Sequence, residues 1–269
     1  MTVILLRHGR STSNTAHTLA GRSEGVELDD KGHAQAAALA LTAGMGMAQT
    51  VRIATEGAYP PFNFVDDSGK VTGFEIELGD ELCKRAALEC TWVTNDWDSI
   101  IPNLVSSNYD AIMAGMNISD ERKKAIEFSL PYTPPPLSAY AAASADANIE
   151  GVVAAQINTI QAGFVAESGA TLSEFATGEE TIAAVRDGQA EAVFADKDFL
   201  APYVKESNGE LVWVKGQDKV VVGEGIAIGL RQSDTELKAK FDAAIKSMRD
   251  DGSLNTMIKK WFGDEALVF

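Results

Sequence analysis

The chain has 269 residues, of which 45% are hydrophobic and 23% charged, so it can bury a core and is not expected to be disordered. Its 23 basic and 39 acidic side chains give a net charge of −16 at pH 7, which argues against nucleic acid or an anionic membrane surface as the main partner. No stretch approaches the ~20 consecutive apolar residues of a membrane-spanning helix.

The composition changes near residue 48. All three histidines (His8, His17 and His33) lie before this point, whereas every Phe, Tyr and Trp lies after it. The first 48 residues carry four basic and four acidic side chains, so the whole net charge of −16 belongs to residues 49–269. We interpret the chain as two unrelated pieces joined at this position.

The N-terminal piece begins with an apolar, partly β-branched run at residues 2–6, followed by Arg7, His8 and Gly9. A strand that delivers these residues into a turn places a nucleophilic imidazole beside a cation that can hold phosphate. Together with the DDKG sequence at residues 29–32, this pattern resembles the histidine phosphatase (phosphoglycerate mutase-like) superfamily. The resemblance implies that His8 is the phosphorylated histidine and that Arg7 binds phosphate.

The phosphatase resemblance covers only residues 1–38. The family also needs a second catalytic histidine and a further phosphate-binding arginine, and the chain has no histidine after His33. One strand and one turn provide no walls for a phosphate pocket. We therefore expect an inert fragment here rather than an active phosphatase.

A second pattern occupies residues 34–48, where small apolar residues end in the sequence GMA before Gln49. This is typical of the apolar region and cleavage site of a secretory signal peptide, although residues 1–33 stand where its basic start would lie. The alternative is an Ala-rich amphipathic helix or linker, and the sequence leaves both open. Our interpretation is that phosphatase-like sequence has replaced the start of an exported protein's signal peptide.

The remaining piece has no histidine and only two cysteines, Cys83 and Cys90. A histidine-based catalytic triad or a His/Cys zinc site therefore cannot be built there. The two cysteines form either a disulfide or a pair of buried thiols. A disulfide that closes so short a loop would contribute roughly 2–3 kcal/mol and would imply an oxidising compartment.

From residue 50 onward, strand-like and helix-like segments alternate. In the first half we expect strands at residues 50–55, 91–94 and 110–116, a hairpin from residues 62–65 and 70–73, and helices at residues 75–88, 97–105 and after Ser119. In the second half we expect strands at residues 137–142, 152–156, 192–195, 211–214 and 225–230, and helices at residues 159–167, 179–187, 197–206, 235–249 and 253–262. This alternation predicts an α/β fold with largely parallel sheets.

Several motifs in this piece occur in a characteristic order. They are VRIATEGAYPPF at residues 51–62, GFEIEL at 73–78, WDSIIP at 97–102, SDER at 119–122 and KWFG at 260–263. Together they closely resemble the periplasmic amino-acid-binding proteins of ABC importers, in particular the lysine/arginine/ornithine, histidine and opine binders. The resemblance covers residues 49–269.

The resemblance implies a two-lobe, periplasmic-binding-protein-like II fold with two hinge crossings. Matching segments place lobe 1 at residues 49–134 plus 226–269 and lobe 2 at residues 138–222. It further implies a periplasmic monomer that traps an amino acid by lobe closure and delivers it to the membrane permease subunits, without enzymatic activity, cofactor or metal. Cys83 and Cys90 fall where some members of the subgroup have a disulfide.

Two charged residues are expected to hold the backbone groups of an amino acid. Arg122, just inside the helix that Ser119 caps, matches the family position that binds the carboxylate through a guanidinium fork. Asp196, at the end of an apolar strand, matches the position that binds the α-ammonium. The alternatives are a solvated helix arginine for Arg122 and an ordinary helix N-cap for Asp196.

The other expected site residues surround the ligand side chain and complete its hydrogen bonds. Tyr59 and Trp97 match the aromatic pair that sandwiches the aliphatic stem, although each alone would more often be a core aromatic. Glu56, after the first strand, is placed to neutralise a distal ammonium or guanidinium. The family positions that supply hydrogen bonds are Ala114, Gly115, Asn117 and Thr159, of which Ala114 and Gly115 can offer only backbone groups.

These charges favour a cationic amino acid such as lysine, arginine or ornithine. One alternative is an opine or another polar amino acid, because an EGxY sequence at residues 56–59 also looks like the opine binders. The other is a dehydratase-like enzyme on the same fold, with Glu56 or Asp196 as its general acid or base.

Overall fold

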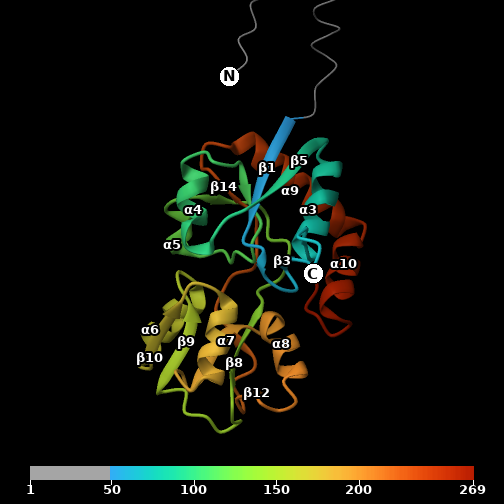
Figure 1. The fold of residues 1–269 in the computed structure, drawn as a ribbon. Helices are drawn as coiled ribbons and strands as arrows, with labels where there is room; N and C mark the ends of the chain where they lie inside the picture. The colour runs from blue at the N-terminus through green and yellow to red at the C-terminus, as the bar shows by residue number, and fades with distance from the viewer. Residues whose placement is uncertain (1–48) are drawn as a thin grey trace, which may run out of the picture. The chain divides into compact units, whose positions relative to one another are not determined.

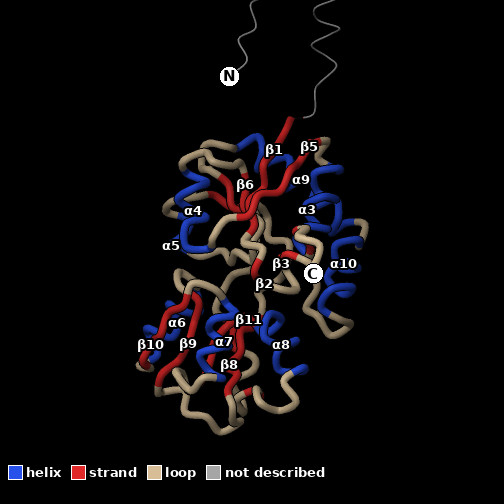
Figure 2. The backbone as a smooth tube through the Cα atoms, in the orientation of Figure 1, coloured by secondary structure: helices blue, strands red, loops and turns tan. Residues whose placement is uncertain are grey.

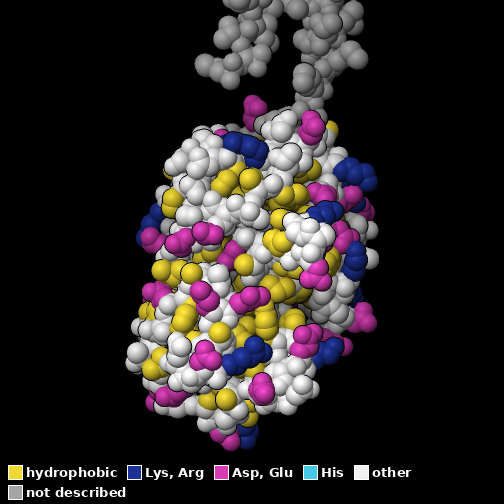
Figure 3. Space-filling model, in the orientation of Figure 1, with side chains coloured by type: hydrophobic (Ala, Val, Ile, Leu, Met, Phe, Trp, Pro, Cys, Tyr) yellow, Lys and Arg dark blue, Asp and Glu magenta, His cyan; other side chains and the backbone are white. Residues whose placement is uncertain are grey.

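The computed structural model describes residues 49–269, and the predictions made for residues 1–48 lie outside this described part. Residues 50–269 form one compact unit in which two α/β lobes follow one another from the top to the bottom of Figure 1. Acidic and basic side chains are interspersed over both lobes on the face seen in Figure 3. None of the helices in the described part is long and apolar enough to cross a membrane.

The first lobe is built on a five-stranded sheet with the strand order β5-β1-β6-β14-β7. Its strands are β1 (Gln49–Thr55), β5 (Leu88–Thr94), β6 (Ala111–Ile112), β7 (Glu127–Phe128) and β14 (Gly229–Leu230). Its helices are α3 (Phe74–Arg85), α4 (Trp97–Val105), α5 (Asp120–Lys123), α9 (Thr235–Asp250) and α10 (Ser253–Phe262). Successive residues of β1 point to opposite faces, so Ile53 packs into the core beneath α3, α9 and α10, whereas Ala54 packs into the core beneath α4.

The second lobe is built on a six-stranded sheet with the order β10-β9-β11-β8-β12, and β13 also pairs with β8. Its strands are β8 (Leu137–Ala142), β9 (Val152–Gln156), β10 (Thr171–Phe175), β11 (Ala192–Asp196), β12 (Val212–Trp213) and β13 (Val220–Val221). Its helices are α6 (Ile160–Ser168), α7 (Gly178–Arg186) and α8 (Lys197–Glu206). Every residue of β11 is buried, because helices cover both faces of this sheet.

The chain crosses between the lobes twice, and the two crossings run side by side. In the first lobe, Tyr132 N–H donates to the Ile226 carbonyl over 2.8 Å. In the second, Val220 and Val221 pair with the first residues of β8. A small three-stranded sheet of β2 (Ala58–Tyr59), β3 (Asn63–Val65) and β4 (Val71–Thr72) completes the first lobe, and Figure 2 shows β2 and β3 where this lobe faces the second.

The predicted alternation of strands and helices is present, but the sheets are mixed rather than largely parallel. The strands that lead out of or into a crossing are antiparallel to their neighbours: β8 to β11, and β14 to β6. The strand at residues 171–175 was missed because most of its residues are partly or fully exposed at a sheet edge, so it lacks an apolar pattern. The helix predicted for residues 75–88 ends at Arg85, and Leu88 already begins β5.

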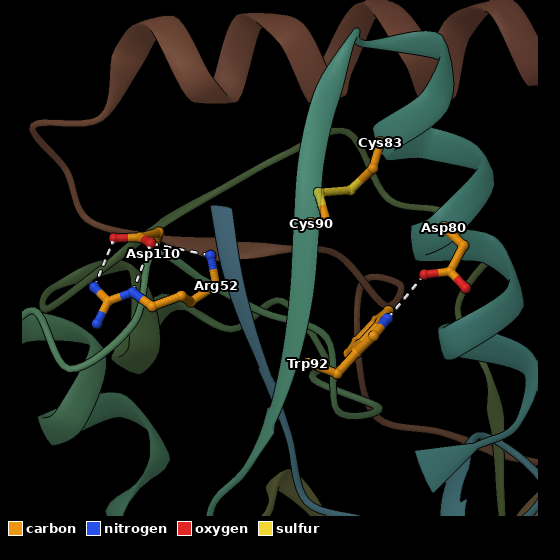
Figure 4. The surroundings of a disulfide bond; sticks show 6 residues. All are labelled: Arg52, Asp80, Cys83, Cys90, Trp92 and Asp110. Atoms are coloured by element: carbon orange, nitrogen blue, oxygen red, sulfur yellow. Dashed lines mark hydrogen bonds and ion pairs between the residues drawn. A yellow bond between two sulfur atoms is a disulfide. The ribbon is translucent and has the colours of Figure 1, made fainter. Parts of the chain in front are cut away.

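Cys83 on α3 and Cys90 on β5 form a disulfide, which decides between the two alternatives left open by the sequence (Figure 4). The bond fastens the C-terminal end of α3 to the edge strand of the sheet. One helical turn earlier, the Asp80 carboxylate accepts a hydrogen bond of 2.9 Å from the Trp92 indole of the same strand. Two contacts therefore fix how α3 lies along β5.

Candidate ligand-binding site

A pocket lies between the two lobes. All nine residues predicted as ligand-binding line it: Glu56, Tyr59, Trp97, Ala114, Gly115, Asn117, Arg122, Thr159 and Asp196. Three lining residues were not predicted, namely Gln156, Ile160 and Gln161. The fold thus brings together side chains from positions 140 residues apart in the sequence.

The strand order explains why these residues meet. In the first lobe β1 and β6 are parallel neighbours, so the segments after them, which carry Glu56 and Gly115, leave the sheet at the same edge. In the second lobe the same holds for β9 and β11, which end at Gln156 and Asp196. Ligands of open α/β sheets bind at such carboxyl ends.

Among residues 49–269, Arg122 is the only basic residue that lines this cavity. Ser119 caps the short helix α5 by accepting from Arg122 N–H, and the guanidinium is turned inward, with the residue only 9% exposed. Its Nη atoms donate to two uncharged acceptors, the Asn117 carbonyl at 2.7 Å and the Asn158 carbonyl at 3.0 Å. Burial lowers the pKa of the guanidinium to about 10, and the charge of Asp196 acts against this fall.

This geometry excludes the solvated alternative for Arg122. Within residues 49–269 the guanidinium forms no ion pair, and it lies over the Trp97 ring, 5.0 Å from the ring centroid. A buried cation held only by carbonyl dipoles and an aromatic face is suited to an incoming anion.

Asp196 ends β11 and is 3% exposed. Its two carboxylate oxygens accept from Tyr59 OH at 3.0 Å and from Gln161 Nε2 at 2.9 Å. Burial raises the pKa of Asp196 to about 7; the Tyr59 hydrogen bond opposes this rise, whereas the charge of Asp198 adds to it. Asp196 occupies the N-cap position of α8, but its side chain makes no capping hydrogen bond to this helix, so it does not act as an ordinary N-cap.

Glu56 is the second carboxylate of the cavity. Its Oε1 accepts from Gln156 Nε2 over 2.6 Å, across the gap between the lobes. Burial raises the pKa of Glu56 to about 7, the hydrogen bond from Gln156 lowers it, and the charges of Glu75 and Asp96 raise it. Asp196 is buried and Glu56 is partly buried, and neither carboxyl group has a cation in direct contact among the described residues.

Tyr59 and Trp97 are both 8% exposed and present aromatic surface to the cavity. The Tyr59 ring stacks on Phe199 of the second lobe, with centroids 4.2 Å apart and planes 4° from parallel. The Trp97 ring lies against the Arg122 guanidinium, and its Nε1 has no hydrogen-bond partner within the described residues. Each ring therefore belongs to the cavity wall and also packs against a neighbour.

The hydrogen-bonding positions differ in what they still offer. The Gly115 N–H already donates to Glu75 Oε1 at 2.7 Å, so the carbonyl oxygen is the backbone group that Gly115 still has to offer. Thr159 caps α6, accepting from Ala162 N–H at 3.1 Å and donating to the Gln156 carbonyl at 2.7 Å. Asn117 is 2% exposed and its Oδ1 is unpaired within residues 49–269.

The two glutamines that the sequence analysis missed each donate to a cavity carboxylate, Gln156 to Glu56 and Gln161 to Asp196. Gln156 ends a predicted strand, so the argument that identified Asp196 also applied to it. Gln161 lies inside a predicted helix, where a polar residue is ordinary. Nothing in the local pattern distinguishes it.

Three hydrogen bonds join the lobes around the cavity: Glu56 to Gln156, Tyr59 to Asp196 and Arg122 to Asn158. Each of them involves a charged cavity residue. Since two carboxylates face one guanidinium, the site is complementary to a molecule with two cationic groups and one anionic group.

This fold and site define a solute-binding protein. The model of the family "Bacterial extracellular solute-binding proteins, family 3" matches residues 51–264, and the chain belongs to this family. The family and the two-lobe fold predicted from the sequence are thereby confirmed. A model of the histidine phosphatase superfamily (branch 1) matches residues 3–45, outside the described part.

Individual relatives bind amino acids or opines, according to their names. The octopine-binding periplasmic protein of Rhizobium meliloti is 33% identical over 84% of this chain and 95% of its own length. The lysine/arginine/ornithine-binding periplasmic protein of Escherichia coli is 31% identical over 80% of this chain and 88% of its own. The crystal structure of a periplasmic His/Glu/Gln/Arg/opine family-binding protein from Silicibacter pomeroyi, in complex with lysine, is 65% identical, with a TM-score of 0.80 over 81% of this chain and all of that one.

Proposed function

We propose that this chain binds a cationic amino acid, lysine, arginine or ornithine, and delivers it to the permease of an ABC importer. The observation that carries the proposal is the charge pattern of the cavity, in which a partly buried carboxylate, Glu56, and a buried one, Asp196, line the same space as one buried guanidinium, Arg122. A dibasic amino acid carries the complementary set of charges. The lysine complex of the 65% identical protein supports the same class of ligand.

Each charged residue has one role in this proposal. Arg122 holds the α-carboxylate as a fork, Asp196 accepts from the α-ammonium, and Glu56 neutralises the distal cation. The aliphatic stem lies between Tyr59 and Trp97, whose ring faces favour a chain that ends in a cation. Asn117, Thr159 and the carbonyl groups of Ala114 and Gly115 complete the hydrogen bonds.

Ligand capture occurs by closure of the lobes. A ligand that contacts Glu56 and Arg122 in one lobe and Asp196 in the other favours the closed state by its differential affinity for the two states. The hinge lies at the paired crossings, with lobe 1 at residues 49–134 plus 226–269 and lobe 2 at residues 138–222. We place the protein in the periplasm as a monomer, as expected for a partner of membrane permease subunits.

The chain acts by binding rather than by catalysis. The observation that favours an enzyme is the presence of two carboxyl groups with pKa values of about 7 in one cavity, which suits a general acid or base. Both carboxyl groups have a binding role here, however, and Asp196 is already engaged by Tyr59 and Gln161. Incubating the protein with each candidate substrate and looking for a new product separates catalysis from binding.

The proposal is tested by titrating the purified chain calorimetrically with lysine, arginine, ornithine, histidine, glutamine and octopine. Binding of a dibasic amino acid with a Kd of about 1 μM or less, about −8.2 kcal/mol, is the expected result. Preference for octopine would move the proposal to the opine binders. Absence of heat with all six would contradict it.

A further inference from the structure

Glu75, in the first turn of α3, is a carboxylate with 0% exposure that does not line the cavity. It accepts three hydrogen bonds from uncharged donors: Gly115 N–H at 2.7 Å, Asn63 Nδ2 at 2.7 Å and the Tyr132 hydroxyl. Burial raises the pKa of Glu75, and these three hydrogen bonds act against the rise. Burying a charge is costly, so we looked for the role of Glu75 in the groups that its carboxylate binds.

Two backbone groups fix the direction of this network, because a backbone N–H can only donate. Gly115 N–H donates to Glu75, and Gly57 N–H donates to Asn63 Oδ1 over 2.7 Å. The Asn63 amide therefore turns its oxygen to Gly57 and its NH₂ group to Glu75. Gly57, Asn63 and Glu75 form a chain of hydrogen bonds that all point toward the carboxylate.

The three branches of this network lead to three parts of the binding apparatus. Gly57 directly follows Glu56, the residue assigned to the distal cation. Gly115 lines the cavity. Tyr132 lies at the first crossing, where its N–H donates to Ile226 of the second crossing.

We propose that Glu75 is a positioning residue of the binding site, which holds the Gly57 turn through Asn63 and thereby places Glu56 for the distal cation of the ligand. This inference rests on the proposed function. It makes Glu75 act on ligand selectivity although it lies outside the cavity.

The direction of the network predicts a specific defect for Glu75→Gln. The new amide oxygen can keep Gly115 and Tyr132, but its NH₂ group then faces the NH₂ group of Asn63. If Asn63 turns over, its NH₂ group faces the Gly57 N–H instead. Either way two donors meet, and the link to Gly57 loses one hydrogen bond.

The same reasoning predicts a rescue. Asn63→Asp combined with Glu75→Gln places a carboxylate between two donors, Gly57 N–H and the new amide of residue 75. All four hydrogen bonds are then possible, with the negative charge moved by one side chain. Glu77→Gln is the matched control, because Glu77 lies on the same helix but binds Lys260 and Trp261 on the outer side.

The experiment compares lysine with norleucine, which lacks only the distal ammonium, by calorimetric titration of the full chain. Amide hydrogen exchange at Gly57 and Gly115 is followed by NMR without ligand. For Glu75→Gln we expect about tenfold weaker lysine binding, norleucine binding within about twofold of wild type, and faster exchange at Gly57 but not at Gly115. In the double variant, the lysine affinity and the exchange rate at Gly57 are expected to return to about their wild-type values. Glu77→Gln is expected to change neither the two affinities nor the exchange rates.

Wild-type lysine affinity in Glu75→Gln, or an equal loss for both ligands without recovery in the double variant, would overturn the inference. If Glu75→Gln does not fold, Asn63→Ala decides, because it removes the link to Gly57 and leaves Gly115 and Tyr132 bonded to Glu75. The same lysine-selective loss is expected, and unchanged selectivity overturns the inference. Failure of the wild-type chain to bind lysine would count against the proposed function instead. The hydrogen-bond network would then be tested by amide exchange alone: exchange at Gly57 that is no faster in Glu75→Gln than in wild type would overturn the inference.

Discussion

Replacing Asp196 by Asn is expected to change stability and ligand affinity in opposite directions. The substitution nearly keeps the shape of the side chain. Its oxygen can still accept from Gln161, and its NH₂ group faces Tyr59, whose hydroxyl can turn to accept. The fold therefore tolerates the change, and the main effect is the loss of a buried negative charge.

The size of the stability effect follows from the pKa of Asp196. A rise from 3.8 to about 7 on folding corresponds to roughly 4 kcal/mol. The pKa of Asp196 is higher in the folded than in the unfolded chain. Its contribution to the free energy of unfolding is therefore fully present below about pH 4 and is lost as the pH rises through about 7. At pH 8 the ligand-free wild type therefore bears the full cost of a buried, ionised Asp196. Asp196→Asn is then expected to be more stable than wild type by as much as about 4 kcal/mol.

Lysine binding is expected to respond in the opposite sense. Removing the partner of a desolvated ammonium costs about 2–5 kcal/mol, so the Kd rises at least thirtyfold or so. Thermal unfolding at pH 8 without ligand and calorimetric titration with lysine measure the two effects. Asp187→Asn is the control for affinity, because Asp187, which caps the C-terminal end of α7, is exposed and does not line the cavity. An Asp196→Asn protein that is less stable than wild type at pH 8 and binds lysine equally well would refute this reasoning.

Three further predictions follow from the same contacts. Lysine affinity should rise between pH 6 and pH 8, by up to about tenfold for each of Glu56 and Asp196. Both carboxyl groups have a pKa of about 7 and must be ionised to bind a cation. Equal affinities in calorimetric titrations at pH 6, 7 and 8 would contradict this. Glu56→Gln should weaken lysine binding about tenfold or more and leave norleucine within a few fold, since it removes only the distal counter-charge; an equal loss in both titrations would disprove the assignment. Replacing both Cys83 and Cys90 by Ser should lower the free energy of unfolding, measured by urea titration, by about 2–3 kcal/mol, because the disulfide closes only a short loop. Lysine affinity should not change, because neither residue lines the cavity. A change in lysine affinity would contradict this prediction.

The parts of the site that the sequence predicts are those fixed by local rules. Glu56 and Asp196 follow strand-like segments, and the carboxyl ends of parallel strands converge wherever the sheets are assembled. Arg122 follows a Ser cap, which places it in the first turn of a helix. The family resemblance then assigns roles that these positions alone do not have.

The parts that the sequence does not predict depend on contacts between distant segments. Glu75 looks like an ordinary acidic residue at a helix N-terminus, favoured there by the helix dipole. Only the folded chain brings Gly115 and Tyr132 to its carboxylate. Likewise, the antiparallel pairing of β8 follows from the crossings between lobes, which leave no periodic pattern in the sequence.

Three charged side chains, Glu56, Arg122 and Asp196, are proposed to recognise the three charged groups of a dibasic amino acid. Removing these groups from the ligand one at a time tests this recognition most directly. Norleucine lacks the distal ammonium, 6-aminohexanoate lacks the α-ammonium and cadaverine lacks the carboxylate, whereas lysine has all three. Titrated against the wild-type chain, each truncated ligand is expected to bind at least about tenfold more weakly than lysine. A truncated ligand that binds as tightly as lysine would show that the residue assigned to the missing group does not recognise it.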